Sequence, residues 1–434
     1  MLPLGLSFQQ APPYSVPLRF FVTAPLFLLA AATLLGIAGP DLLASRHSPA
    51  ALAATHLLTL GFSSMVMCGA LFQLLPVLGG VPLAHPGRVA WLVHAPLTIG
   101  TACLAAAFLW HQPLLFALAA TALAAAFGYF GVRLAPALWK ARGGGPSLRG
   151  MRTALMALAL TLTLGLALAA AFGGRGLPVP YARFAPAHPL WGLGGWTALL
   201  IVGLAYQLIP MFHLTAPYPA LMTSRLVPSL FLLLAAATLA EWIPGPVGSA
   251  LSKAATLGLA AGYLWFAAVT WRLFERRRRK VPDTTLQFWR LGLLLLSLSC
   301  CIAAAGRLTD AGLPDRWQLA AGILALPGFI LCVIQGMLYK IIPFLTWFHL
   351  QSAYPGLGIV PNVREIHARF HAPEHLALFA VALATLVAAC WIPELSRVAG
   401  MLWAVQALWL EANVVQAAQI FRTVGQVARM REAH

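Results

Sequence analysis

Charged residues are scarce in this chain. Only 9% of its 434 residues are Asp, Glu, Lys or Arg, whereas 60% are hydrophobic, and the mean hydropathy is +0.82. Soluble globular domains carry about 25% charged residues, so the composition excludes that class. The sequence predicts a polytopic membrane protein.

Cysteine is also rare, and no two cysteines have the CxxC spacing. All six fall inside apolar stretches: Cys68, Cys103, Cys300, Cys301, Cys332 and Cys390. This pattern excludes a disulfide framework, a thiolate zinc site and covalent haem attachment. We expect these cysteines to be small core residues.

Acidic residues are fewer than basic ones: the chain has 11 Asp and Glu against 28 Lys and Arg, which gives a formal net charge of +17. A basic excess can indicate a nucleic-acid partner, but here the basic residues cluster in short segments between apolar runs, at 140–152, 276–280 and 422–431. Such clusters mark the cytoplasmic side of a membrane protein. We therefore expect no nucleic-acid partner, although 276–280 also has the composition to bind anionic membrane lipid.

Twelve apolar stretches are long enough to cross a hydrocarbon core, which takes about 20 helical residues. They lie near 18–38, 54–78, 90–110, 113–138, 153–173, 188–212, 226–243, 250–272, 288–306, 318–345, 374–393 and 399–422. None alternates with the two-residue period of a barrel strand, so we predict an all-α fold of 12 transmembrane helices. We expect the first of them to remain in the protein as a membrane helix rather than to be cleaved off as a signal peptide. Because the basic clusters follow even-numbered helices, we expect a multi-pass protein of the bacterial inner (plasma) membrane with cytoplasmic termini.

An octapeptide recurs as GALFQLLP at 69–76, GLAYQLIP at 203–210 and GMLYKIIP at 336–343. Its spacing of 134 and 133 residues predicts one membrane domain, 1–434, built from three pseudo-symmetric four-helix repeats at approximately 1–150, 151–285 and 286–434. In each copy we expect the glycine to admit a neighbouring helix, the polar residue (Gln73, Gln207 or Lys340) to reach the headgroups, and the proline to end the helix.

Two histidines stand at the mouths of helices in adjacent repeats. His56 precedes the first octapeptide by 13 residues and His188 precedes the second by 15, so both are expected near the outer surface. Polar residues in spans often mark a site, and a neutral imidazole is an iron ligand whose other nitrogen needs an acceptor, for which Thr55 and Thr59 are near in sequence. An interfacial histidine without a ligand is the alternative for either residue.

His56 also belongs to a longer pattern. Together with Gly61, Phe62, Gly69 and Pro76 it gives the spacing H-x4-G-F-x6-G-x6-P. This resembles helix two of the NnrS family, which are haem- and copper-associated membrane proteins linked to nitric oxide metabolism, and the helix count and repeats resemble subunit I of the haem-copper oxidases. The resemblance implies haem b held by His56 and His188, copper as a second metal, and a role in nitric oxide or respiratory electron-transfer metabolism with a respiratory-chain protein as partner.

The chain departs from the oxidase pattern where that pattern places copper. The seventh predicted span has no histidine, the tenth has none in its body, and Ala54 stands where the NnrS pattern has a histidine. The three-histidine copper site of the oxidases therefore cannot form from the expected positions. Proton-pumping oxygen reduction is not expected, and whether the protein is an enzyme stays open.

Two other titratable residues lie inside predicted spans. His94, in the apolar segment VHAPLTIG, is interpreted either as a hydrogen-bonded core histidine or as a further cofactor ligand or proton relay. Glu411 is the only acid near the centre of a span and is a candidate for a proton pathway. Three histidines recur at every fourth residue from 367 to 375, but Pro373 interrupts them, so we expect a solvated inner loop there.

Two other function classes remain open. A membrane oxidoreductase acting on oxygen or nitric oxide would need a metal site built from unorthodox residues such as His94. A secondary transporter also fits an intramembrane acid and internal repeats. Repeats of four helices, however, keep the same orientation in the membrane, which favours the oxidase-like scaffold over the inverted repeats common in transporters.

Overall fold

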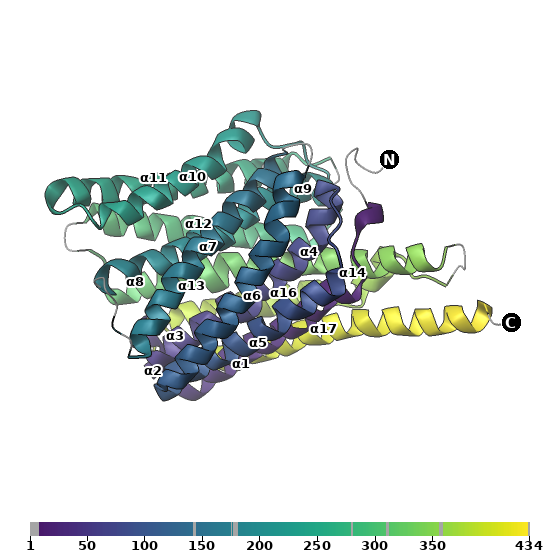
Figure 1. Ribbon diagram of the computed structural model, residues 1–434, viewed down its shortest axis with the longest axis horizontal. Helices are drawn as coiled ribbons and strands as arrows, with labels where there is room; N and C mark the ends of the chain where they lie inside the picture. The colour runs from purple at the N-terminus through teal and green to yellow at the C-terminus, as the bar shows by residue number, and fades with distance from the viewer. Residues whose placement is uncertain are drawn as a thin grey trace.

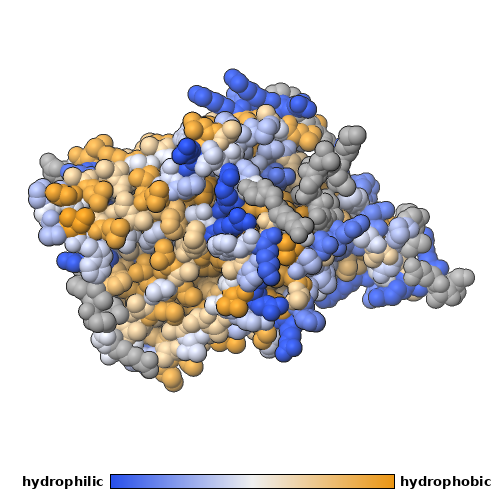
Figure 2. Space-filling model, turned by 45° about the horizontal axis from the view of Figure 1, so that its top comes forward, coloured by the Kyte–Doolittle hydropathy of each residue, from blue (hydrophilic) through white to orange (hydrophobic). Residues whose placement is uncertain are grey.

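The computed structural model describes residues 8–141, 145–174, 176, 181–278, 281–309, 312–355 and 359–432. Every regular element in these residues is a helix, and eleven helices among them are long and apolar enough to cross a membrane. The chain is therefore an all-α, multi-pass membrane protein in contact with lipid. Figure 2 shows a broad apolar surface over one end of the molecule and hydrophilic side chains gathered toward the other.

The long helices lie side by side in one bundle (Figure 1). Their bounds are η1 (Phe8–Gln10), α1 (Ser15–Ala38), α2 (Pro40–Leu43), α3 (Pro49–His56), η2 (Leu57–Ser64), α4 (Met65–Gly79), α5 (Pro86–Trp110), α6 (Pro113–Lys140), α7 (Pro146–Phe172), α8 (Tyr181–Pro189), η3 (Leu190–Thr197), α9 (Ala198–His213), α10 (Ala220–Ala240), α11 (Gly245–Glu275), α12 (Thr284–Leu308), α13 (Asp315–Ile323), η4 (Leu324–Leu331), α14 (Cys332–Ala353), α15 (Val363–Ala368), α16 (Ala372–Ala388) and α17 (Leu395–Glu432).

The predicted stretch 374–393 differs from the other eleven. It forms α16, an apolar helix of 17 residues that is shorter than the membrane-length helices. A helix normally needs about 20 residues to cross the hydrocarbon core, so α16 is not counted among the eleven. By contrast, α17 has 38 residues and extends beyond both ends of the predicted stretch 399–422.

Three membrane helices contain a π-helical segment of eight residues. These segments, η2, η3 and η4, begin 133 and 134 residues apart, and each leads directly into a helix that carries one octapeptide: α4, α9 or α14. A π-helical turn holds an extra residue, and such turns are often found at functional sites. The recurrence repeats the spacing of the octapeptides.

The octapeptide glycines lie where two helices come close. A Cβ atom on Gly69 would lie 2.8 Å from an atom of α1, one on Gly336 would lie 2.5 Å from an atom of α12, and one on Gly203 would lie 2.6 Å from Gly150 Cα on α7. No side chain larger than hydrogen fits these crossings without movement of a neighbour. The predicted role of the glycines in admitting a neighbouring helix is confirmed.

The octapeptide prolines and polar residues do not behave as predicted. The helices continue through all three prolines, because α4 ends at Gly79, α9 at His213 and α14 at Ala353. Gln73 is buried rather than directed to the headgroups. Proline at these positions loses one backbone hydrogen bond, which a helix packed on its neighbours can tolerate.

Lys340 also has a protein partner instead of a headgroup. Its Nζ lies 2.9 Å from Asp283 Oδ2, and Asp283 Oδ2 lies 3.3 Å from His213 Nδ1. Burial alone would raise the pKa of Asp283, but the contacts with His213 and Lys340 outweigh it and hold that pKa well below its usual range. This ion-pair cluster ties together the end of α9, the middle of α14 and the residue before α12.

The bundle closes on itself. α6 packs on α7, α11 on α12, and α17 returns to α1. Tyr14, just before α1, stacks on Phe421 near the end of α17 with ring centroids 4.3 Å apart. The first and last described elements therefore lie at the same end of the bundle (Figure 1).

Candidate functional site

The imidazole rings of His56 and His188 lie next to each other. Their ring centroids are 6.1 Å apart, and the ring planes differ by 19°. His56 is the last residue of α3, directly before η2, and His188 lies in α8, two residues before η3. The structure thus brings together the two histidines singled out by the sequence, and each stands at the start of a π-helical segment.

Each imidazole is held through Nδ1 by a backbone carbonyl. His56 Nδ1 lies 2.7 Å from the Leu52 oxygen, and His188 Nδ1 lies 3.2 Å from the Thr161 oxygen on α7. A carbonyl oxygen only accepts, so Nδ1 of both rings carries the proton and Nε2 carries the lone pair. Neither Nε2 has a hydrogen-bond partner among the described residues.

The acceptors differ from those suggested by the sequence. Thr59 donates to the carbonyl of Thr55 on its own helix and not to His56. A histidine four residues after a carbonyl can reach it within one helical turn, which explains the bond to Leu52. The bond to Thr161 comes from a residue 27 positions earlier in the chain, so no local sequence signal exists for it.

The walls of the site are apolar and closely fitted. A Cβ atom on Gly165 of α7 would lie 2.9 Å from His188 Cε1. Any residue other than glycine at this position would therefore push the His188 ring aside. On the other side, Phe108 of α5 stacks on His56 with centroids 5.3 Å apart, and Phe116 and Phe172 continue this aromatic cluster. Neither Gly165 nor the phenylalanines were identified as site residues from the sequence.

The spacing of the pair suits a single ligated metal ion. Two imidazoles that each bind one ion at about 2 Å have ring centroids about 6 Å apart. Three or more His, Cys, Asp or Glu side chains do not gather in a metal-binding group anywhere in the described ranges. The pair by itself would supply two nitrogen ligands to a metal ion.

His94 lies in a different part of the bundle. Its Nε2 is 2.8 Å from Thr23 Oγ1 on α1, and its ring packs edge-on against Phe20. Phe108, which touches His56, is 14 residues further along α5, or about 21 Å at 1.5 Å per residue. The structure does not bring His94 to the histidine pair, and its contacts are those of a hydrogen-bonded core residue.

Glu411 is half-buried on α17, and its Oε2 is buried without a hydrogen-bond partner in the described part of the chain. No described contact joins it to His56 or His188. Its role in a proton pathway stays a prediction.

The expectation of a solvated loop around the histidines at 367–375 is wrong for His375. That residue is fully buried, and its Nε2 lies 3.0 Å from the Gln406 carbonyl on α17. His371 adopts a left-handed backbone conformation, with φ of 47°, directly before α16. The chain changes direction at His371 and begins α16, whose first helical turn buries His375 against the bundle. Pro373 alone did not indicate this new helix.

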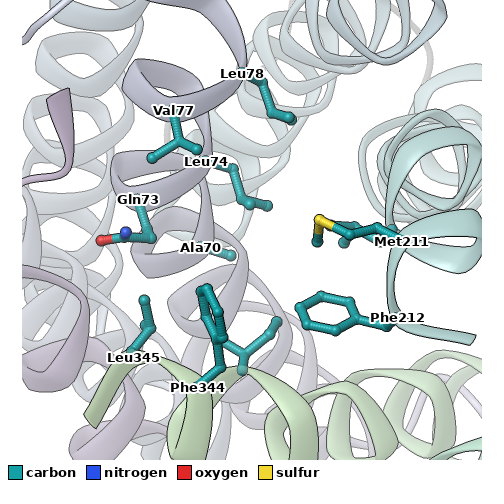
Figure 3. Close-up of a pocket in the computed structure, with 11 residues that line it drawn as sticks. Ala70, Gln73, Leu74, Val77, Leu78, Met211, Phe212, Phe344 and Leu345 are labelled. Carbon is teal, nitrogen blue, oxygen red and sulfur yellow. The ribbon is translucent and has the colours of Figure 1, made fainter. Parts of the chain in front are cut away.

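An apolar cavity lies where the three octapeptide helices meet. Figure 3 shows Met211 and Phe212 of α9 facing Leu74 of α4 across it, with Phe344 of α14 alongside, while the amide of Gln73 points away. Its lining is almost wholly apolar, and the Met211 side chain lies at its edge. The cavity shows that α4, α9 and α14 converge on one axis.

No protein-family model and no curated protein matches the chain. The role of the histidine pair therefore has to be inferred from its own geometry.

Proposed function

We propose that the protein binds haem b between His56 and His188 and acts in electron transfer within respiratory or nitric oxide metabolism. The observation that carries this proposal is the pair of neighbouring, nearly parallel imidazoles whose Nε2 atoms both have a free lone pair. Haem supplies reversible one-electron chemistry at its iron.

The surroundings of the pair support a ligand role. A hydrogen bond from Nδ1 to a carbonyl fixes the tautomer and makes Nε2 a stronger ligand, and Leu52 and Thr161 supply these carbonyls. Phe108 keeps water away from one ring. If both histidines held the iron, no ligand position would be left for oxygen or nitric oxide, and electron transfer would be favoured over their reduction.

We also infer that the bundle consists of three four-helix repeats, with α16 as the remaining membrane helix. Three independent features support this: the spacing of η2, η3 and η4, the glycine contacts with α1, α7 and α12, and the cyclic packing of α6 on α7, α11 on α12 and α17 on α1. In this arrangement the histidine pair joins the first two repeats. The basic segments put the chain ends in the cytoplasm and the pair near the outer face of the bacterial inner membrane.

The visible spectrum of the purified protein tests the proposed function. We expect red protein with the absorption bands of a reduced b-type haem after dithionite, and about one iron per chain by metal analysis. Colourless protein would contradict the proposal. Protein that contains copper but no porphyrin would show that the pair holds a metal ion directly.

Gly165→Leu is expected to weaken haem binding without unfolding the bundle. The new side chain must displace the His188 ring, which is a movable side chain rather than backbone. Disturbing the support of a metal ligand costs about 10–100-fold in affinity. Haem titration of the apoprotein measures the effect, and Gly131→Leu on α6, where no atom lies within 4 Å of the new Cβ, is the matched control. Equal affinities in the two variants would argue against a ligand role for His188.

A further inference from the structure

A second set of polar side chains lies buried between α14, α16 and α17, away from the histidine pair. Its members are all less than 9% exposed: Gln335, Tyr339, His375, Gln406 and Asn413. The amide of Gln406 donates to that of Gln335, and Asn413 Nδ2 lies 3.0 Å from Tyr339 Oη. Together with the bond from His375 Nε2 to the Gln406 carbonyl, these contacts join three helices through polar groups in the core of a membrane protein, where polar groups are costly.

The cluster has more polar atoms than protein partners. His375 Nε2 donates to a carbonyl, so its Nδ1 is a lone-pair acceptor, and that atom is buried without a partner in the described chain. Gln335 Nε2 and Gln406 Oε1 are likewise buried and unpartnered there. Turning either amide over still leaves unpaired groups, because two amides that share one bond cannot satisfy each other.

Unpaired buried polar atoms are rare in native proteins, and where they gather an ordered water usually pairs them. Here both kinds of group are left over: donors at the Gln335 amide nitrogen and the Tyr339 hydroxyl, and acceptors at Gln406 Oε1 and His375 Nδ1. Water can donate and accept at once and therefore satisfies both kinds. A single charged ligand would match only one of them.

The cluster continues toward the end of the bundle where the ion-pair cluster lies. The ring of His367 is 6.3 Å from that of Tyr339, and its Nε2 is also buried without a partner among the described residues. Burial lowers the pKa of His367, the charge of Lys340 lowers it further, and Asp283 acts in the opposite direction. His367 thus contacts the buried cluster through Tyr339 and also interacts with the charges of Lys340 and Asp283.

Only the third octapeptide has this polar setting. Gln335 directly precedes its glycine, whereas the residues that precede the first two glycines are Cys68 and Val202, both fully buried. The polar cluster is therefore not a requirement of the repeated architecture. It is a local addition to one third of the chain.

We propose that this cluster is a water-filled path that runs from the level of Lys340 and Asp283 inward to Gln335, with His375 Nδ1 as an acceptor for its water. A line of water between charged groups and a buried histidine is also the arrangement that proton relays in membrane proteins use. The path does not depend on the proposed haem site.

Hydroxyl-radical footprinting of the intact protein by X-ray radiolysis tests the path, because radicals formed from bound water modify the side chains beside it. Tyr206 occupies the same octapeptide position as Tyr339 and is slightly more exposed, 7% against 2%. If no water were bound, Tyr339 would be modified no faster than Tyr206. We expect Tyr339 to be modified severalfold faster, and equal or slower modification would overturn the proposal.

A double variant, Gln335→Leu with Gln406→Leu, identifies the cluster as the source of the water. Replacing both partners of a buried hydrogen bond by apolar groups of similar shape is close to neutral for stability. Modification of Tyr339 is then expected to fall to the rate of Tyr206. An unchanged rate in a folded double variant would contradict the proposal, and if that variant does not fold the comparison in the unmodified protein decides.

Discussion

Replacing His56 with alanine is expected to abolish the b-type absorption bands of the purified protein, and His188→Ala to do the same. Each change removes one of two imidazole rings whose centroids are 6.1 Å apart. Loss of a ligand itself should cost more than the roughly 10–100-fold that loss of a ligand's hydrogen-bond partner costs. The measurement is the haem content per chain, compared by pyridine haemochrome spectra.

Two other histidines serve as controls for this result. His47 is exposed in the loop before α3, and His94 is bonded to Thr23 away from the pair. His47→Ala and His94→Ala should both keep a full complement of haem. Loss of haem in His94→Ala with retention in His188→Ala would move the ligand role to His94.

Gly203→Leu is expected to cause the largest loss of stability among single substitutions at the octapeptides. Its Cβ would lie 2.6 Å from the Cα atom of Gly150, so the new side chain meets backbone and can only push α7 and α9 apart. We expect a cost of about 3 kcal/mol or more, at or beyond the upper end of ordinary overpacking. Thermal unfolding in detergent, followed by size-exclusion chromatography, measures it.

The same substitution at an open glycine separates crowding from the loss of glycine itself. Gly131→Leu places its side chain where no protein atom lies within 4 Å. Leucine also favours a helix over glycine by roughly 1 kcal/mol, so this variant should be at least as stable as the parent protein. Equal stability of the Gly203→Leu and Gly131→Leu variants would contradict the close crossing.

The fold was predictable where it depends on composition and repetition. Runs of about 20 apolar residues locate the membrane helices, and the octapeptide spacing located Gly69, Gly203 and Gly336 at helix crossings, which the structure confirms. The π-helical segments were not predictable, because their residues are as apolar as those around them. The predicted range 374–393 runs past the end of α16 at Ala388, because hydropathy alone does not show where a helix ends.

The candidate site was predictable only in part. His56 and His188 stood out because histidine is rare inside spans and because the two occupy similar positions before successive octapeptides. What completes the site comes from distant segments: the Thr161 carbonyl and Gly165 belong to α7, and Phe108 to α5. Backbone carbonyls and small residues carry no chemical signature in a sequence, so their role appears only once helices are packed.

The polar cluster around His375 escaped prediction for the same reason. Gln335, Gln406 and His375 lie on three helices, and nothing in the sequence shows that they meet. The burial of His375 reverses the usual expectation for a polar residue near a loop.

Electron paramagnetic resonance of the oxidised protein tests most directly whether His56 and His188 share one iron. Two imidazole ligands give low-spin ferric iron, and ring planes only 19° apart predict a rhombic low-spin signal that is absent from His188→Ala. A high-spin signal in the parent protein, or a low-spin signal that survives the loss of His188, would contradict the shared site.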